Sequence, residues 1–373
     1  ITINMILPDA QGKEKRIDGI TFLVVDKLSC PIIIGLPQII KKIPSIFISH
    51  FVAAMAAAHH KELTRLKLTM LYTPKAKKPD QRDVKVINLN VNGFTSAVSK
   101  GLLDYLQKQE HDILVLTEVK LTEGKHRTAT QQLQSIGYKV VSIYSTMGYA
   151  GILMASKLDE IPVEVHGIAG EDPTEQEPRF MTLTFEETPL IICGMYAPFN
   201  NPDKPERSEY INKFYKLVNP YLSKVIKTAK RTHMAVIVAG DIQVAPTPLD
   251  QSQNADPFGP GSTQLERNHF QSLIKLGLTD SYRQLHPDTR SYTAHARYAA
   301  RQNDPNQIVE KRIDHILISK NVEPLKVQID NAARTFSDHS AITALVAINP
   351  SDNKNTRYAS LQAATIPDLV SDS

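Results

Sequence analysis

The sequence predicts a mixed α/β (α+β) fold for residues 84–348, and three observations carry this prediction. Short apolar runs of strand length alternate with longer segments whose apolar residues recur at helical spacing. Some runs, such as AVIVA at 235–239, contain no polar residue and therefore predict buried strands. Polar side chains suited to catalysis directly follow several of these runs, and strand ends hold such residues rigidly.

The expected elements can be placed in order along the chain. Apolar runs predict strands at residues 84–89, 112–116, 138–144, 152–155, 180–185, 190–195, 235–239, 316–318 and 341–348. Helical spacing predicts helices at residues 96–108, 207–230 and 264–276. In the first of these helices, Leu102, Leu103 and Leu106 share one face.

Composition divides the chain into four parts. Residues 1–71 form an apolar N-terminal extension, and residues 72–83 (YTPKAKKPDQRD) predict a basic linker because they are polar and contain two prolines. The domain at 84–348 follows, and the tail at 349–373 is rich in Ser, Asp and Asn, which predicts a flexible segment. The chain begins with Ile1 rather than Met, so we expect a fragment of a longer protein.

Bulk properties exclude only a few classes of protein. A net charge of +4 permits a polyanionic partner without requiring one. Two cysteines, Cys30 and Cys193, are too few for a disulfide framework and fit a reducing, intracellular compartment. The most apolar stretch, 44–58, is too short to span a bilayer, so we expect no membrane partner. P-loop, HExxH and CxxC motifs are absent from the sequence.

Polar residues follow apolar runs at six places, and their number makes a pattern that one such residue would not. These residues are Asn90, Glu118, Tyr196, Asp241, Asp314 and the pair Asp338–His339. Four carboxylates and a histidine placed in this way can converge on one cleft.

The residue types suggest roles, each with a simpler alternative. Glu118 is a candidate ligand for a hard cation such as Mg²⁺, or equally a solvated loop residue. Asp241 follows a strand without polar residues, which favours a carboxylate that orients or deprotonates a water. Asn90 alone is more simply a turn residue. A carboxylate such as Asp314 can fix the tautomer of a histidine, although a lone histidine such as His339 is more often structural.

Taken in order, six segments resemble the motifs of the endonuclease/exonuclease/phosphatase superfamily, the fold of exonuclease-III-type nucleases. The segments are NLNVNG, TEVK, MYAPFNN, GDIQVAP, RIDHIL and SDHSAI. The resemblance implies a four-layer αββα sandwich of two packed sheets flanked by helices, and a metal-dependent hydrolase that uses Mg²⁺, with Mn²⁺ as the alternative. It implies that the catalytic residues are Asn90, Tyr196, Asp241, Gln243, Asp314 and His339, and that the metal ligands are Glu118 and Asp338.

Finer wording resembles the endonuclease of LINE-type retrotransposons. The segments that carry this resemblance are LDQ at 249–251, the run from ERNHF to QLHP at 266–287, and SYT at 291–293. The resemblance implies DNA as the partner, nicked in the nucleus to prime reverse transcription, and a reverse transcriptase encoded by the same element as a second partner. A polymerase is absent from this chain, which agrees with a fragment, and the oligomeric state is left open.

Three positions depart from the motifs. Gln243 stands where the motif has Asn, and a displacement of its amide by roughly 1 Å can cost around a hundredfold in rate. Asn92 stands where Asp is frequent, which removes one carboxylate. Ala294 replaces an aromatic residue, which weakens an abasic-site interpretation because a bulky wedge is less evident.

Two other functions and one further resemblance stay open. The domain can instead be a phosphatase of the same fold that acts on a lipid or inositol phosphate, or a catalytically impaired nucleic-acid-binding relic. Residues 22–39 (FLVVDKLSCPIIIGLPQI) resemble the end of a retropepsin-like protease without its Asp-Thr/Ser-Gly triplet, which indicates a truncated, inactive remnant. An unrelated apolar segment is the alternative.

Overall fold

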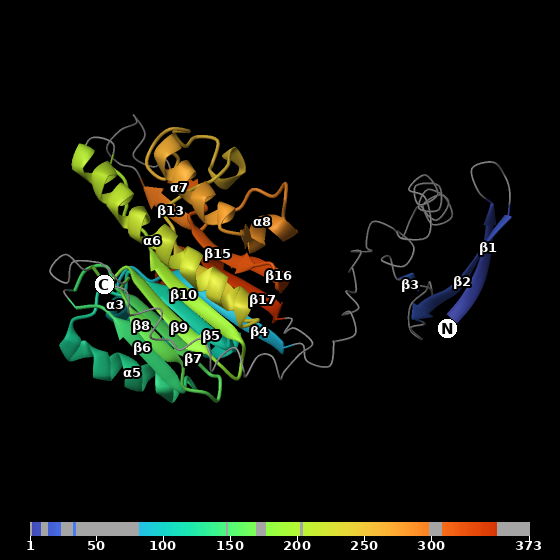
Figure 1. The fold of residues 1–373 in the computed structure, drawn as a ribbon, viewed down its shortest axis with the longest axis horizontal. Helices are drawn as coiled ribbons and strands as arrows, with labels where there is room; N and C mark the ends of the chain where they lie inside the picture. Colours follow the sequence, from blue (N-terminus) through green and yellow to red (C-terminus); the bar gives the residue numbers. More distant parts are fainter. Residues whose placement is uncertain are drawn as a thin grey trace. The chain divides into compact units, whose positions relative to one another are not determined.

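The computed structural model describes residues 2–8, 14–23, 33–34, 82–146, 148–168, 177–201, 204–297 and 308–348. The chain divides into two units, residues 1–78 and 79–373 (Figure 1). In the first unit β1 (Thr2–Pro8), β2 (Glu14–Leu23) and β3 (Ile33–Ile34) form an antiparallel sheet. The predicted segment at 44–58, the predicted tail, Cys30 and most of the retropepsin-like stretch lie outside the described residues.

The second unit is built on two six-stranded sheets with the same arrangement of strand directions. The first sheet has the order β16 (Val322–Asp330), β17 (Ala341–Ile348), β4 (Arg82–Asn90), β5 (Ile113–Thr117), β7 (Ile152–Ser156) and β6 (Val140–Tyr144). The second has the order β12 (Leu278–Asp280), β15 (Asp314–Ser319), β11 (Ala235–Asp241), β10 (Leu190–Tyr196), β9 (Phe180–Phe185) and β8 (Val163–His166). Each sheet has one parallel pair at its centre, β4–β5 and β10–β11, between antiparallel neighbours.

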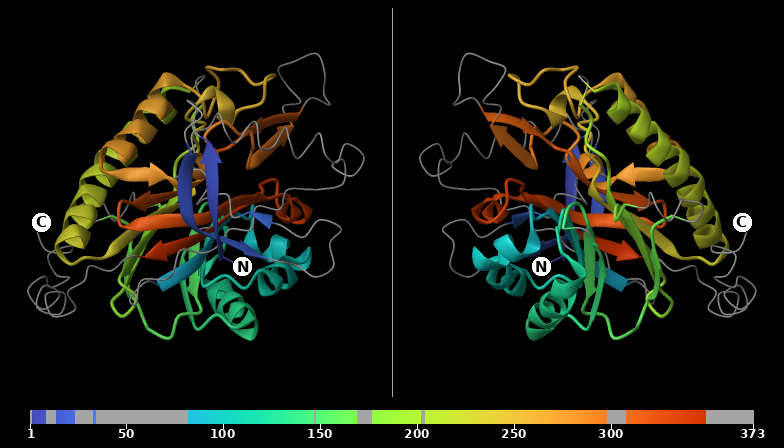
Figure 2. Two further views of the ribbon diagram at one scale, coloured as in Figure 1. Left: turned by 90° about the vertical axis from the view of Figure 1, so that its right-hand side faces the viewer. Right: turned by 90° about the vertical axis from the view of Figure 1, so that its left-hand side faces the viewer.

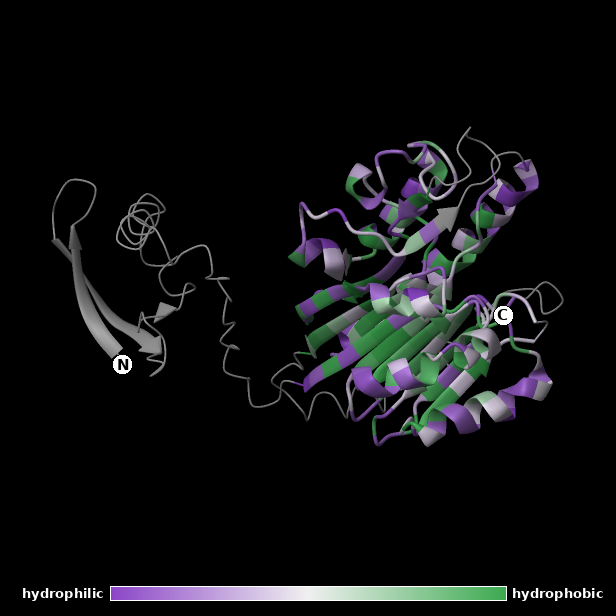
Figure 3. Cartoon of the chain, turned by 180° about the vertical axis from the view of Figure 1, so that it is seen from behind, coloured by the Kyte–Doolittle hydropathy of each residue, from purple (hydrophilic) through white to green (hydrophobic). Residues whose placement is uncertain are grey.

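Alternate residues of the central strands pack into two different cores, because successive side chains point to opposite faces of a sheet. In β4, Val84 and Val86 enter the core between the sheets, whereas Ile87 and Leu89 pack on the helix side. In β11, Ile237 faces the other sheet. Strands covered on both faces therefore read as continuous apolar runs, and Figure 3 shows apolar residues concentrated in them.

Helices cover the outer face of each sheet, as Figures 1 and 2 show. The core of the first sheet's outer face includes residues of α3 (Phe94–Ser99), α4 (Leu102–Gln109) and α5 (His126–Ser135). The second sheet packs against α6 (Pro205–Arg231) and α7 (Gln264–Lys275). The predicted sandwich of two packed sheets flanked by helices is confirmed.

Several element predictions need correction. The helix expected at 96–108 is divided into α3 and α4, because Gly101 adopts φ 104°, a left-handed conformation that interrupts the helix. Strand β4 begins at Arg82, inside the predicted linker. The sequence analysis did not anticipate α5, α8 (Ser281–Leu285), β8, β12, β16 or the hairpin of β13 (Ala294–Arg297) and β14 (Ile308–Lys311), which lack long apolar runs. Within the described part of the chain, no helix has the length and apolarity that a membrane span requires.

Candidate active site

The central strands of both sheets end at one edge of the sandwich, and the inward-facing residues at these ends have polar side chains. In the parallel pair β10–β11, Tyr196 lies opposite Asp241, and in the antiparallel pair β11–β15, Asp241 lies opposite Asp314. Asn90 ends β4, opposite Thr117 of β5. Asn90, Tyr196, Asp241 and Asp314 continue the alternation that fills the core between the sheets. The same periodicity that builds the core therefore directs these four side chains toward one another.

Asn90 joins carboxylates that come from the two sheets. Its Nδ2 donates to Glu118 Oε2 at 2.8 Å and to Asp241 Oδ2 at 2.9 Å. The hydroxyl of Tyr196 also donates to Glu118 Oε2, at 3.1 Å. The Asn90 side-chain oxygen accepts the backbone N–H of Asn92 at 2.9 Å, which fixes the orientation of the amide.

Asp314 and His339 form a buried ion pair. The distance from His339 Nδ1 to Asp314 Oδ2 is 2.7 Å. Burial alone would lower the pKa of His339, but the carboxylate of Asp314 outweighs this effect and the pKa rises to about 10. The backbone N–H groups of Ile313 and Asp314 both donate to Thr293 Oγ1 at 3.1 Å, which fixes the start of β15. The site therefore holds an imidazolium at neutral pH.

Asp241 is fully buried and held by two amides. Besides Asn90, Gln243 Nε2 donates to Asp241 Oδ2 at 2.7 Å, and the backbone N–H of Gln243 donates to Oδ1 at 3.1 Å. Burial, together with the charge of Asp314, raises the pKa of Asp241 to about 8, against the opposing effects of His339 and Asn90. Gln243 thus reaches the carboxylate despite its additional methylene.

Four residues of the site have left-handed backbone conformations that non-glycine residues rarely adopt. These are Asn92 (φ 46°), Glu118 (φ 55°), Lys120 (φ 51°) and Gln243 (φ 62°). Such conformations cost roughly 1–3 kcal/mol each and persist where the surrounding structure imposes them. These four residues lie close together at one edge of the sandwich, which indicates that the contacts of their side chains impose the unfavourable backbone conformations.

The accessible side of the site is a chain of charged and amide groups. Lys120 Nζ lies 2.8 Å from Glu118 Oε1 and donates to Asn92 Oδ1 at 2.7 Å. Asn92 Nδ2 in turn donates to Asp338 Oδ1 at 3.2 Å. Mg²⁺ and similar hard cations prefer carboxylate oxygens as ligands. One such oxygen, of Glu118, already forms an ion pair with the ammonium group of Lys120. Glu118 and Asp338 thus supply carboxylate oxygens at the two ends of the chain of contacts that runs through Lys120 and Asn92.

A second group of donors is less suited to a metal. Donor atoms of Asp241, Asp314 and His339 lie within 4.8 Å of one another. Metal ligands must be deprotonated, whereas the raised pKa keeps the His339 ring protonated and paired with Asp314. A cation bound by this group would therefore have to displace the proton of His339 and separate its ring from Asp314.

The structure brings all eight predicted site residues together at one edge of the sandwich. They are Asn90, Glu118, Tyr196, Asp241, Gln243, Asp314, Asp338 and His339. Sequence reasoning missed Lys120 and the role of Ser337, whose hydroxyl donates to Asn90 O at 2.6 Å and accepts the His339 N–H at 3.0 Å. Their positions beside Glu118 and His339 in the chain were the available signals.

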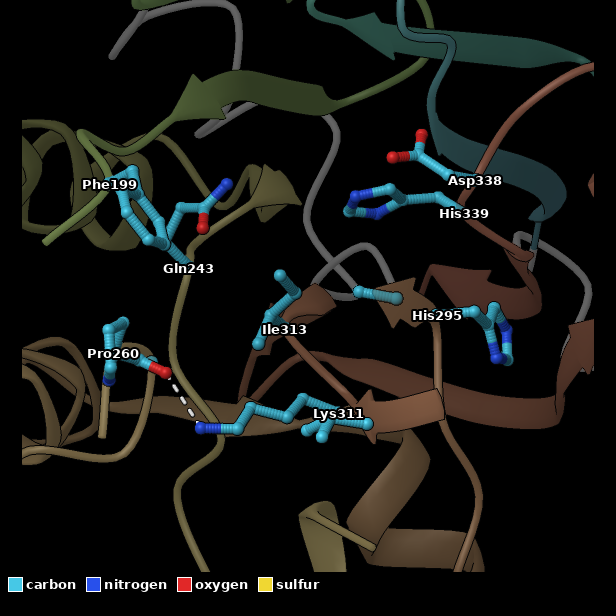
Figure 4. Close-up of a pocket in the computed structure, with 11 residues that line it drawn as sticks. Phe199, Gln243, Pro260, His295, Lys311, Ile313, Asp338 and His339 are labelled. Carbon is cyan, nitrogen blue, oxygen red and sulfur yellow. Dashed lines mark hydrogen bonds between the residues drawn. The ribbon is translucent and has the colours of Figure 1, made fainter. Parts of the chain in front are cut away.

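A cavity of about 160 Å³ adjoins His339 (Figure 4). Its lining includes Phe199, Gln243, His295, Lys311, Asp338 and His339. Phe199 is 42% exposed. Ala294, where an aromatic residue was expected from the resemblance, also lines the cavity and leaves space in it.

Comparison with known proteins gives a consistent result. Residues 87–339 match the endonuclease/exonuclease/phosphatase family. The chain is 29% identical over 272 residues to the exodeoxyribonuclease of Bacillus subtilis (strain 168), a match that covers 71% of this chain and 100% of the relative. It is 27% identical over 278 residues to a DNA-(apurinic or apyrimidinic site) endonuclease of Dictyostelium discoideum, covering 73% of each protein. An AP endonuclease structure from Archaeoglobus fulgidus has the same fold, with a TM-score of 0.60 and 23% identity over 70% of this chain and 98% of that one.

Proposed function

Because the chain belongs to the endonuclease/exonuclease/phosphatase family and is a metal-dependent hydrolase, we propose that it nicks DNA by water attack on a backbone phosphate, with Mg²⁺ as the cation. The observation that carries this proposal is the buried Asp241 carboxylate. It is held by the amides of Asn90 and Gln243. The imidazolium of His339 belongs to the same buried cluster. A base and an acid are thus kept at one edge of the sandwich.

The proposed mechanism assigns a task to each group. The ionised form of Asp241 orients the attacking water and accepts its proton, and the amides of Asn90 and Gln243 fix the carboxylate. Because the pKa of Asp241 is about 8, this form is the minority at pH 7 and its share grows as the pH rises toward 8. His339, kept protonated by Asp314, stabilises the negative charge that develops on the phosphate or supplies a proton. A divalent cation at Glu118 and Asp338 would neutralise that charge further.

Tyr196 is placed to support the leaving group. Burial, and then the nearby carboxylate of Glu118, raise the pKa of its hydroxyl well above the ordinary value, so the group stays protonated. Its O–H already donates to Glu118. A protonated phenol in this place can donate a hydrogen bond to an oxygen that gains charge as the phosphate ester breaks.

We further propose that the domain is the endonuclease of a LINE-type retrotransposon. It would act in the nucleus beside a reverse transcriptase encoded by the same element. Its support is the wording of residues 249–251, 266–287 and 291–293. On this proposal, residues 22–39 are an inactive retropepsin-like remnant.

A second substrate, DNA that has lost a base, is favoured by a specific observation. Relatives include an endonuclease named for apurinic or apyrimidinic sites, and the cavity beside His339 measures about 160 Å³. Pockets for drug-sized ligands begin at about 300 Å³, so this cavity suits a bare sugar better than a whole nucleotide. The absence of an aromatic residue at Ala294 speaks against a wedge at that position but enlarges the cavity.

Plasmid nicking by the full chain tests the proposed function. Supercoiled DNA is incubated with the protein in Mg²⁺ and in EDTA, beside Asp241→Ala and His339→Ala, with the exposed Lys227→Ala in α6 as the matched control. We expect relaxed circles that require Mg²⁺, persist in Lys227→Ala and disappear in the two site variants. Intact plasmid in every lane, together with phosphate release from an inositol phosphate, would contradict DNA nicking and identify the protein as a phosphatase.

A further inference from the structure

Lys311 places an amine in the wall of the cavity that His339 also lines. It ends β14, and its Nζ donates to Pro260 O at 2.7 Å (Figure 4). The same Nζ donates to Ser262 Oγ at 2.8 Å. Both partners are uncharged oxygens. The aliphatic part of the side chain passes Gly261, where an added Cβ would lie 3.5 Å from Lys311 Cδ. The amine is therefore held in place by a few contacts that do not neutralise its charge.

The surroundings of Lys311 favour its neutral form. Burial lowers the pKa of the amine to about 8, and the more distant carboxylates of Glu266 and Asp256 oppose this shift only in part. Roughly one molecule in ten then carries a neutral amine at pH 7. Desolvated lysines of this kind are the ones that form Schiff bases with carbonyl substrates.

Lys120, the other lysine at the site, has the opposite environment. Its ammonium group forms an ion pair with Glu118 at 2.8 Å, and the side chain is 37% exposed. The same ammonium group also donates to Asn92 Oδ1 at 2.7 Å, so Lys120 is held by a carboxylate and an amide, where Lys311 has only uncharged oxygens as hydrogen-bond partners. The two lysines therefore differ in chemistry although both lie close to the proposed cleavage site.

We propose that Lys311 captures the aldehyde of a base-free deoxyribose in DNA as a Schiff base, an activity separate from hydrolysis. This inference rests on the proposal that DNA enters the cleft, and it assigns the cavity to the sugar of a nucleotide that has lost its base. In its ring-opened form such a sugar carries an aldehyde at C1′, whereas an intact nucleotide does not.

The step requires no reactant beyond the two partners. The lone pair of Nζ attacks C1′ and forms a C–N bond, and the carbonyl electrons move to oxygen. Both amine protons then leave with that oxygen as water, so that an imine joins Lys311 to the DNA. Hydride from an added borohydride reduces the imine to a stable secondary amine, which makes the intermediate measurable.

Borohydride trapping with the full chain tests this inference. A duplex with one abasic site is incubated with the protein in EDTA and cyanoborohydride, and covalent protein–DNA complexes are separated by denaturing electrophoresis. We expect a complex that falls at least tenfold in Lys311→Arg and in Lys311→Met, and that persists in Lys120→Arg and Lys227→Arg. A duplex with a tetrahydrofuran analogue, which has no aldehyde, serves as the chemical control.

The outcomes separate this inference from the proposed function. Asp241→Asn should abolish nicking and leave trapping intact, because the imine needs neither the base nor the cation. Peptide mapping of the wild-type adduct decides the attachment site even if a Lys311 variant folds poorly, which a thermal melt reveals. An adduct mapped to Lys120 or to the N-terminus, or the lack of any adduct, would overturn the inference whatever the nicking assay shows.

Discussion

The two halves of the site differ in their access to water, and this difference separates two kinds of chemistry. Asp241 and Asp314 are fully buried and His339 is 8% exposed, whereas the side chain of Glu118 is 21% exposed. In the buried half, desolvation and the charge of Asp314 raise the pKa of Asp241, and Asp314 raises the pKa of His339 against the opposing effect of desolvation. The accessible half joins Glu118 to Asp338 through Lys120 and Asn92. We call the first the proton-holding half and the second the cation-holding half, after the roles proposed for them.

The comparison also explains why both sheets are needed. Asn90 from one sheet donates to Glu118 on its own sheet and to Asp241 on the other. A buried carboxylate without hydrogen bonds would be costly, so the amide stabilises the proton-holding half while it orients the cation-holding half. Loss of this amide would affect both halves together.

We expect the largest effect from a substitution that changes the proton-holding half alone. Asp241→Asn keeps the shape of the side chain but removes the base, so we expect nicking to fall roughly 10²–10⁴-fold. The substitution also removes a buried charge, which is favourable, and leaves at least one donor to Asp241 without an acceptor, which is unfavourable, so the melting temperature should change little. Single-turnover nicking and thermal melts measure both quantities. A weaker affinity for Mg²⁺ with unchanged turnover would contradict the division between the halves.

The second prediction concerns the pH dependence of folding. The folded-state pKa of His339 is raised from 6.5 to about 10, so its contribution to stability is complete below pH 6.5 and is lost as the pH rises toward 10. The slope is on the order of 1 kcal/mol per pH unit for one proton. Asp241 also contributes stability that is lost as the pH rises, in its case between pH 3.8 and about 8, because its pKa is raised in the folded state. Urea unfolding of wild type and His339→Gln should therefore show a difference in free energy that shrinks from pH 6.5 to 9. A constant difference would mean that His339 is neutral in the folded protein.

The third prediction breaks the cation-holding half. Loss of even an outer-shell partner typically lowers metal affinity roughly 10–100-fold, and we expect Glu118→Gln to lower the apparent affinity for Mg²⁺ by at least that factor. Because the buried half is intact, high Mg²⁺ should restore much of the rate. A titration of nicking against Mg²⁺ measures this, with Glu123→Gln in the exposed 3₁₀ helix Glu123–Lys125 as the matched control. A loss that Mg²⁺ does not relieve would place Glu118 in the proton chemistry instead.

Local pattern was sufficient to single out Asp241 in the buried half, whereas the roles of Asp314 and His339 came from the family resemblance. Asp241 follows a strand without polar residues, and that observation alone indicated a carboxylate with a special environment. The fold followed from motif order and from apolar runs that are buried on both faces. Elements with mixed polarity, such as α5 (HRTATQQLQS), gave too little periodicity to be recognised.

The accessible half depends on contacts that sequence does not display. Asn92 and Asp338 are 246 positions apart, and Lys120 contacts Asn92 from a segment in which Glu118 and Lys120 adopt left-handed conformations. The environment of Lys311 is similarly hidden, since Pro260 and Ser262 lie about fifty residues away. Packing between distant segments, rather than residue type, creates these environments.

We expect the smallest effect from a change in the amide that holds the Asp241 carboxylate in the buried half. Gln243 already donates to Asp241 at 2.7 Å, so the additional methylene does not abolish the contact, but its backbone at φ 62° suits Asn better than Gln. Gln243→Asn shortens the side chain, and we expect nicking to rise by roughly tenfold or less, since a displacement of about 1 Å can cost up to about a hundredfold. Gln243→Ala is the matched loss of the amide and should lower the rate in the same single-turnover assay. If Asn slows the reaction as much as Ala does, the longer amide is adapted to this site, and the distance between Gln243 and Asp241 is itself part of how the carboxylate is held.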